Sequence, residues 1–272
     1  MTLDCHVHIL GGPVDRAGFQ AQLSAAGVDG ALVISIAPRS FGSWSGDYTS
    51  RERLDNLFEW VGDSPNLLPF YWIDPIEDDA LDQVALAVGR GVRGFKCICN
   101  RFFPRDERAM TVFRGIADSG KPVLFHSGIL FDGTDSSRYS RPVEFEPLID
   151  IPGLKFALAH MSWPWCDELI AVFGKFESAR SHRPGGSAEM FIDTTPGTPR
   201  IYREDALRKL FTVGYDVRDR VMFGSDQTAS RYKPDRVRNL IARDTDILRG
   251  LDVGEDVLAN VTGGNLRRFL GI

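Results

Sequence analysis

Leu3-Asp4-Cys5-His6-Val7-His8-Ile9 places two histidines two residues apart in an apolar run near the start of the chain. Such a run is typical of a buried β-strand, in which side chains alternate between two faces. His6 and His8 are therefore expected on one face, with Cα atoms about 6.5 Å apart, and Cys5 on the other. Two imidazoles at that spacing can bind one metal ion, whereas burying them without partners costs free energy. The stretch predicts a first strand that binds a metal.

Similar apolar runs recur along the whole chain. They alternate with stretches whose apolar residues are three and four apart, the spacing of a helix. The predicted strands are Leu3–Ile9, Ala31–Ile36, Leu67–Ile73, Val92–Ile98, Pro122–His126, Leu154–His160, Glu189–Thr194 and Val221–Asp226. The predicted helices are Arg51–Val61, Ala80–Gly89, Glu107–Ser119, Cys166–Phe176, Arg203–Val213 and Pro234–Leu248, with a short one at Phe145–Ile149.

This alternation predicts an α/β protein with a parallel sheet, either open and doubly wound or closed into a barrel. The glycine-rich turn of a dinucleotide-binding sheet is missing after the first strand, where Ile9-Leu10-Gly11-Gly12-Pro13 stands. Eight strand–helix units in 272 residues match the usual size of a (β/α)8 TIM barrel. No Gly/Ser-rich linker divides the chain, so we expect one barrel domain over residues 1–272.

Composition limits the partners. The formal net charge is −5, with acidic and basic residues well mixed, so a nucleic-acid partner is disfavoured. The chain has no apolar stretch as long as a membrane span and no evident leader, so we expect a cytoplasmic protein without membrane contact. Four cysteines in such a chain predict reduced thiols rather than disulfides.

Polar residues gather at the carboxyl ends of the predicted strands. They are His6 and His8 on the first strand, Lys96 on the fourth, His126 on the fifth, His160 on the sixth and Asp226 on the eighth. A barrel brings these ends around one mouth, where active sites lie. Three or four nitrogen and oxygen ligands with an open position are typical of catalytic zinc. The remaining histidine, His182, is expected on the surface away from this mouth.

With these residues in place, the chain resembles the amidohydrolase superfamily, and within it the amidohydrolase 2, or amidohydrolase-related, branch of metal-dependent barrels. The likeness covers nearly the whole chain. Its motifs are Asp4-Cys5-His6-Val7-His8, Gly94-Phe95-Lys96, Leu124-Phe125-His126, Ala159-His160-Met161-Ser162-Trp163-Pro164-Trp165 and Phe223-Gly224-Ser225-Asp226, and the tail Val257–Phe269 resembles the family's closing helix.

The resemblance implies a metal site. The implied ligands of a divalent metal, zinc by default, are His6, His8, His126 and Asp226. Asp226 would also be the general base. His160 would be either a second metal ligand or a catalytic acid/base, whose protonated form would stabilise an oxyanion.

The chemical state of Lys96 distinguishes a site with one metal from a site with two. A carboxylated Lys96 would bridge two metals, whereas an ammonium would face a substrate carboxylate, with Asp74 as a second partner. The Trp163-Pro164-Trp165 motif favours one metal per chain, and two remain the alternative.

The implied activity is hydrolysis of a small ester, lactone or amide that carries a carboxylate, by a metal-activated water. The same branch contains metal-dependent non-oxidative decarboxylases and hydratases, lyases of unsaturated or aromatic acids, and this reaction is the alternative. A non-catalytic barrel with a structural metal is the third hypothesis. The expected partner is a small-molecule substrate, and a homodimer is an open question.

Substrate contacts are expected from the loops at the mouth. Their arginines are Arg39, Arg101, Arg105, Arg138, Arg141, Arg200, Arg203 and Arg231. Most are expected to be ordinary solvated charges, and a few that face inward would suit an anionic substrate. Trp163, Trp165, Phe102 and Phe103 are candidates for an apolar pocket wall.

Overall fold

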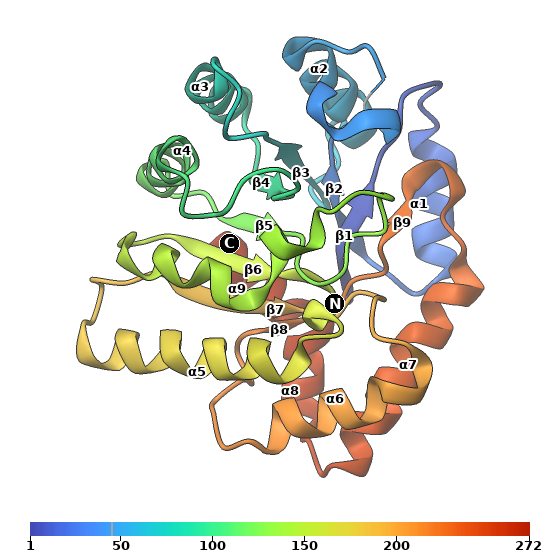
Figure 1. Ribbon diagram of the computed structural model, residues 1–272. Coiled ribbons are helices and arrows are strands. Elements are labelled where there is room, and N and C mark those ends of the chain that lie inside the picture. The colour runs from blue at the N-terminus through green and yellow to red at the C-terminus, as the bar shows by residue number, and fades with distance from the viewer. Residues whose placement is uncertain (45) are drawn as a thin grey trace.

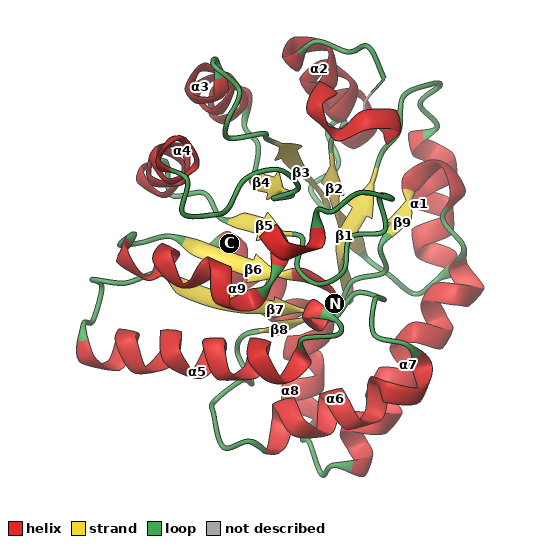
Figure 2. Ribbon diagram, viewed as in Figure 1, coloured by secondary structure: helices red, strands yellow, loops and turns green. Residues whose placement is uncertain are grey.

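The computed structural model describes residues 1–44 and 46–272, which form a curled parallel sheet surrounded by helices (Figure 1). Figure 2 shows the same view by type of structure, with strands at the centre and most helices on the periphery. Consecutive strands from β1 to β8 are neighbours in the sheet and all pairs are parallel. The predicted α/β barrel is confirmed.

The elements follow the predicted order closely. The strands are β1 (Leu3–His8), β2 (Gly30–Ile34), β3 (Leu67–Trp72), β4 (Gly94–Cys97), β5 (Val123–Phe125), β6 (Lys155–Leu158), β7 (Glu189–Asp193), β8 (Val221–Met222) and β9 (Gln227–Thr228). The α-helices are α1 (Arg16–Ala25), α2 (Ser50–Val61), α3 (Ala80–Arg90), α4 (Glu107–Asp118), α5 (Cys166–His182), α6 (Arg200–Thr212), α7 (Pro234–Gly250), α8 (Glu255–Ala259) and α9 (Asn265–Leu270). Each of the eight predicted strands overlaps an observed one.

The barrel closes through a broken eighth strand. β8 pairs with β7, and β9, four residues further on, pairs with β1. Between them Phe223 accepts a backbone hydrogen bond from Cys5, and the Asp226 N–H donates to the carbonyl of His6. The predicted run Val221–Asp226 therefore includes both β8 and the break, and Asp226 lies directly beside β1.

Two elements differ from the prediction. Helix α1, which the sequence analysis did not predict, begins after Asp15, whose side chain accepts a hydrogen bond from the Gly18 N–H. The segment after β5 is a 3-10 helix over Pro142–Asp150, which contains the short helix predicted at Phe145–Ile149.

Apolar side chains form two layers. The outer layer lies between the sheet and the helices and includes Phe19 of α1 and Leu54 of α2. The inner layer fills the barrel with strand residues such as Phe70 and Leu124. Helix α9 closes the barrel from one end, because Leu266 and Phe269 belong to this inner layer.

Cys5 corrects the prediction of strict alternation on the first strand. The register of β1 against β2 shifts between Asp4 and Val7, which indicates a bulge. Cys5 therefore faces the barrel interior, where its thiol hydrogen-bonds Asp193, the same carboxylate that contacts His6. All four cysteines are free and buried. Across the described residues, no helix is both long enough and apolar enough to cross a membrane.

Candidate active site

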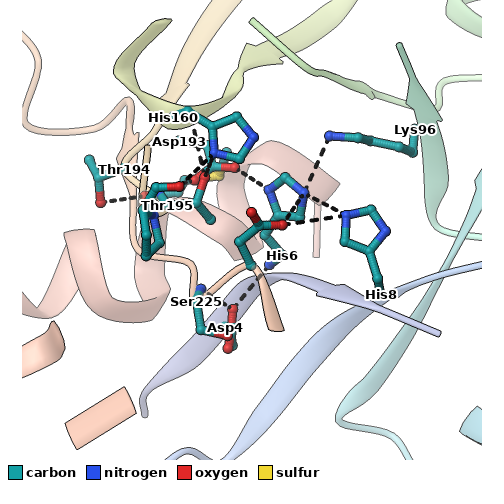
Figure 3. A network of polar contacts seen from close by, with 12 residues as sticks. Asp4, His6, His8, Lys96, His160, Asp193, Thr194, Thr195 and Ser225 are labelled. Atoms are coloured by element: carbon teal, nitrogen blue, oxygen red, sulfur yellow. Dashed lines mark hydrogen bonds and ion pairs between the residues drawn. The ribbon is translucent and has the colours of Figure 1, made fainter. Parts of the chain in front are cut away.

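Three of the predicted ligands converge at the end of β1. The Nε2 atoms of His6 and His8 are 3.1 Å apart (Figure 3). Asp226 Oδ1 is 3.6 Å from His6 Nε2 and 3.5 Å from His8 Nε2. One potential ligand atom from each of the three lies within 4.8 Å of the others. The closure of the barrel by its last strand thus joins Asp226 to the histidines of the first.

Asp193, at the end of β7, orients the His6 ring. Its Oδ2 lies 2.7 Å from His6 Nδ1, and both side chains are buried. The Thr195 N–H donates to the other Asp193 oxygen at 2.6 Å. The ring nitrogen of His6 that faces this carboxylate carries the proton, so His6 Nε2 presents its lone pair to His8 and Asp226. Asp193 was not among the predicted site residues, although it lies one residue before the end of the predicted strand Glu189–Thr194.

Asp4 is a second carboxylate whose role the sequence analysis missed. It is fully buried and accepts hydrogen bonds from the N–H groups of His6 and Ser225 at 3.1 and 2.8 Å and from the Tyr232 hydroxyl at 2.9 Å. Burial raises the pKa of Asp4 to about 6. One side chain thereby fixes the backbone of both segments that carry the three clustered residues.

The cluster fits a divalent metal. Burial lowers the pKa of both His6 and His8 well below the usual value, so their rings are neutral and can ligate. Burial raises the pKa of Asp226 to about 7. Two imidazole nitrogens and a carboxylate oxygen are a donor set that zinc and similar ions prefer. A carboxylate behind a ligating histidine, as Asp193 is, is the usual support of such a site.

His160 lies beside the cluster in an unusual backbone turn. His160, Met161 and Ser162 all have positive φ, of 62°, 48° and 54°. His160 Nδ1 is 3.1 Å from the Pro196 carbonyl, which places its proton on Nδ1. Burial lowers the pKa of His160 to about 4. The free protein therefore has a neutral His160, and the protonated form expected from the sequence is disfavoured.

His126 lines the same cavity as the cluster. Its ring centroid is 4.9 Å from that of His160, which is 5.4 Å from that of His6. The Ile129 backbone hydrogen-bonds the His126 ring, while its buried Nε2 has no hydrogen-bond partner within the described structure. An unsatisfied acceptor suits a ligand, but His126 is not one of the three grouped within 4.8 Å, so its ligand role stays a prediction.

Lys96 reaches into the cluster from β4. Its Nζ is 3.3 Å from His6 Nε2, and burial lowers its pKa to about 8. The carboxylates that favour its charged form are Asp193 and Asp226. Asp74, the partner expected from the sequence, instead pairs with Arg101 at 2.5 Å and accepts from Ser40.

A family model described as Amidohydrolase matches residues 3–272, nearly the whole chain. The chain belongs to the amidohydrolase family. This membership supports an enzyme of the hydrolase type. No curated protein sequence matches the chain significantly.

Solved structures share the fold of this amidohydrolase at low sequence identity. A protein from Acinetobacter baumannii, described as a 2-pyrone-4,6-dicarboxylic acid hydrolase with citric acid bound, is 10% identical with a TM-score of 0.65, over 100% of this chain and 99% of that one. A protein from Staphylococcus aureus that is described as an amidohydrolase is 11% identical with a TM-score of 0.67, over 100% of this chain and 99% of that one. Dihydroorotase from Campylobacter jejuni is 14% identical with a TM-score of 0.58, over 100% and 83%.

The cluster opens into a cavity of about 510 Å³. Its apolar wall consists of Phe41, Trp72, Ile98, Ile129, Leu130, Phe131 and Trp163. Of the predicted wall residues only Trp163 is among them. Phe102 packs in the outer apolar layer, Phe103 stacks edge-on against Tyr139, and Trp165 lies under Arg141.

None of the mouth arginines is among the described residues that line this cavity. In the described part of the chain, Lys96 is the only cation that lines this cavity. Carboxylates hold most mouth arginines away from it, as Glu144 holds Arg105 and Glu168 holds Arg141. Arg203 is buried and pairs with Asp244 at 2.5 Å. Most of these arginines therefore form ion pairs within the protein and do not line the cavity.

His182 behaves as predicted. Helix α5 extends beyond the predicted end at Phe176 to His182, which is exposed in its last turn. Its Nδ1 lies 2.7 Å from the Ser178 carbonyl within the same helix. It is the one histidine that lines no part of the described cavity.

Proposed function

We propose that this amidohydrolase is a metal-dependent hydrolase of a small ester, lactone or amide that carries one carboxylate. The observation that supports it is the convergence of His6, His8 and Asp226 in the lining of one cavity. We propose zinc at this site, one ion per chain. When bound, such an ion polarises a carbonyl and lowers the pKa of water to about 7.

The side chains around the cluster would divide the work of hydrolysis. Asp226 accepts the proton of the attacking water, for which a carboxylate at the cavity wall is suitably placed. Asp193 keeps His6 in the tautomer that presents Nε2 to the site. His160, neutral and with its proton on Nδ1, presents Nε2 as an acceptor and can take a proton from a polarised donor.

The cavity lining supports the proposed substrate class. Lys96 can pair with one substrate carboxylate, and no arginine among the described lining residues offers a second cationic anchor. The apolar wall, with Trp72 and Trp163, suits a compact hydrophobic body. A substrate with one carboxylate and a ring or short acyl chain satisfies both features.

Metal analysis and a substrate panel test this function. Protein purified without chelators should contain about one zinc ion per chain. It should hydrolyse at least one monocarboxylate substrate, with release of a proton from a lactone or ester or of an amine from an amide. Replacement of Asp226 with Asn should keep an oxygen donor and lower the turnover by about 10² to 10⁴. Full turnover by this variant or by metal-free protein would contradict the mechanism.

The same panel separates the lyase alternative. Release of CO₂ from a carboxylic acid, or addition of water to a double bond, without any ester or amide hydrolysis would assign the protein to that class. A metal content near two per chain, or added mass on Lys96, would replace the one-metal site with a bridged pair.

A further inference from the structure

A second groove is lined by Arg200, the first residue of α6, and by residues of the segment Tyr232–Arg243 at the start of α7. Helices α6 and α7 pack against one another (Figure 1). The groove has a volume of about 850 Å³ and shares no lining residue with the cavity of the metal cluster. Its lining residues come after the seventh and eighth strands of the barrel, and the loops after these strands frequently bind phosphate in barrel proteins. Nothing in the proposed hydrolysis uses this groove.

The groove is strongly cationic in a chain of net charge −5. Four of its lining residues are Arg200, Lys233, Arg236 and Arg243, against a single acid, Asp235. That acid is bound by Arg238, outside the groove, and Arg243 pairs with Asp244.

Three of the four cations have no carboxylate in direct contact. Arg200, Lys233 and Arg236 form no ion pair or side-chain hydrogen bond with any described residue, and all three are exposed. Most arginines elsewhere on the mouth face are neutralised, as Arg105 is by Glu144. Like charges gathered in one concave surface repel one another unless an anion lies between them.

The remaining described lining residues of the groove include a buried aromatic ring and apolar side chains. Tyr232 forms a buried wall, and Pro234 and Leu240 add apolar surface. The Tyr232 hydroxyl donates to Asp4 at 2.9 Å, so the wall is fixed to the same carboxylate that holds β1.

We propose that this groove is a binding site for a small phosphate-bearing molecule. A doubly charged oxyanion can accept hydrogen bonds from two guanidinium groups and an ammonium at once, as Arg200, Arg236 and Lys233 would offer. The apolar walls leave room for a compact organic group, and the volume lies within the range of ligand pockets. The groove shares no lining residue with the cavity of the metal cluster, although the charge of Arg236 also acts on the Asp226 carboxylate.

Calorimetric titration with inorganic phosphate at constant ionic strength tests the proposal. Wild-type protein should bind phosphate, and the double variant Arg200→Gln/Arg236→Gln should bind it about tenfold or more weakly, since two charge-assisted hydrogen bonds are lost. Arg114→Gln is the matched control, because Arg114 is an exposed arginine of α4 without an ion pair and its loss changes the net charge by the same amount per substitution. Its affinity for phosphate should equal that of the wild type.

Two further arms locate the bound anion. Lys96→Met removes the only described cation that lines the metal-cluster cavity and should leave phosphate affinity unchanged. Loss of binding in Lys96→Met with full binding in the double arginine variant would overturn the proposal, as would absence of binding to the wild type. Sulfate should compete and acetate should not. Equal competition by acetate would contradict the preference for a multivalent oxyanion.

Discussion

The tautomer of His6 depends on one buried carboxylate. Asp193 accepts the Nδ1 proton at 2.7 Å, while Lys96 Nζ and His8 Nε2 lie near the opposite nitrogen at 3.3 and 3.1 Å. Without the charge of Asp193, the proton of His6 has no strong acceptor on that side. The lone pair that a metal needs would then no longer be fixed in place.

Asp193→Asn should therefore weaken metal binding by about 10- to 100-fold without abolishing it. Competition with a chelator of known affinity measures the change. Asp167→Asn is a suitable control, because Asp167 is an exposed acid that pairs only with Lys209. Equal metal affinity of Asp193→Asn and wild type would show that His6 is oriented by other contacts.

The histidines of β1 give a sharper residue-scale test. His6→Ala and His8→Ala each remove one of the two nitrogen donors of the cluster and should leave little metal after dialysis against buffer. His182→Ala should retain the wild-type content, because that ring is exposed on α5. Retention of full metal by either β1 variant would place the metal elsewhere.

At the scale of elements, strands were easier to predict than the first helix. Each strand is an apolar run long enough to stand out from its neighbours, whereas α1 buries only Phe19 and Leu23. Two apolar residues four apart, among alanine and polar residues, give too weak a period to identify a helix. The bulge in β1 has no sequence signal at all, because it depends on how β1 pairs with its neighbours.

The residues of the candidate site also fall into two groups, those that the sequence predicts and those that only the structure reveals. His6, His8 and Asp226 were predictable, since polar residues at the ends of apolar strands stand out. Asp4 and Asp193 were recognised only through their buried hydrogen bonds to His6. The mouth arginines pair with acids on other elements, such as Glu144 in the 3-10 helix after β5 and Glu168 in α5. These partners are distant in the sequence, so no local pattern predicts the pairing.

The break between β8 and β9 requires a glycine. A Cβ at Gly224 would lie 2.5 Å from Thr195 Cγ2 and 3.0 Å from both Cys5 Sγ and His6 Cβ. Gly224→Ala should thus push β7 and β1 apart, lower stability by about 1 to 3 kcal/mol and weaken metal binding. Thermal melting and chelator competition measure the two effects.

Gly89→Ala serves as the control for that substitution. A Cβ at Gly89 in α3 meets no atom within 4 Å, and alanine favours a helix over glycine by about 1 kcal/mol. It should raise the melting temperature and leave metal affinity unchanged. If Gly224→Ala behaved in the same way, the close approach of β1, β7 and the broken strand would not constrain the site.

At the scale of the whole molecule, the site should link folding to metal and pH. Burial raises the pKa of Asp226 to about 7 and lowers those of His6 and His8 well below the usual value. Below about pH 7 the metal-free protein therefore holds one proton on Asp226 and none on the two rings. A metal must displace that proton, so its affinity should fall by up to about tenfold per pH unit below pH 7.

The stability of the metal-free protein changes with pH in the opposite direction to its metal affinity. A carboxyl whose folded pKa, here about 7, lies above its ordinary 3.8 contributes stability that is complete below the lower value and is lost as the pH rises through the higher. Bound metal adds stability that grows with affinity over the same range. The difference in melting temperature between zinc-loaded and chelator-treated protein should therefore widen as the pH rises from about 5.5 to about 7.5. The Asp226→Asn variant has no proton to displace at this position, so its difference in melting temperature should change much less with pH. If the difference in the wild type were equally independent of pH, Asp226 would not bind the metal.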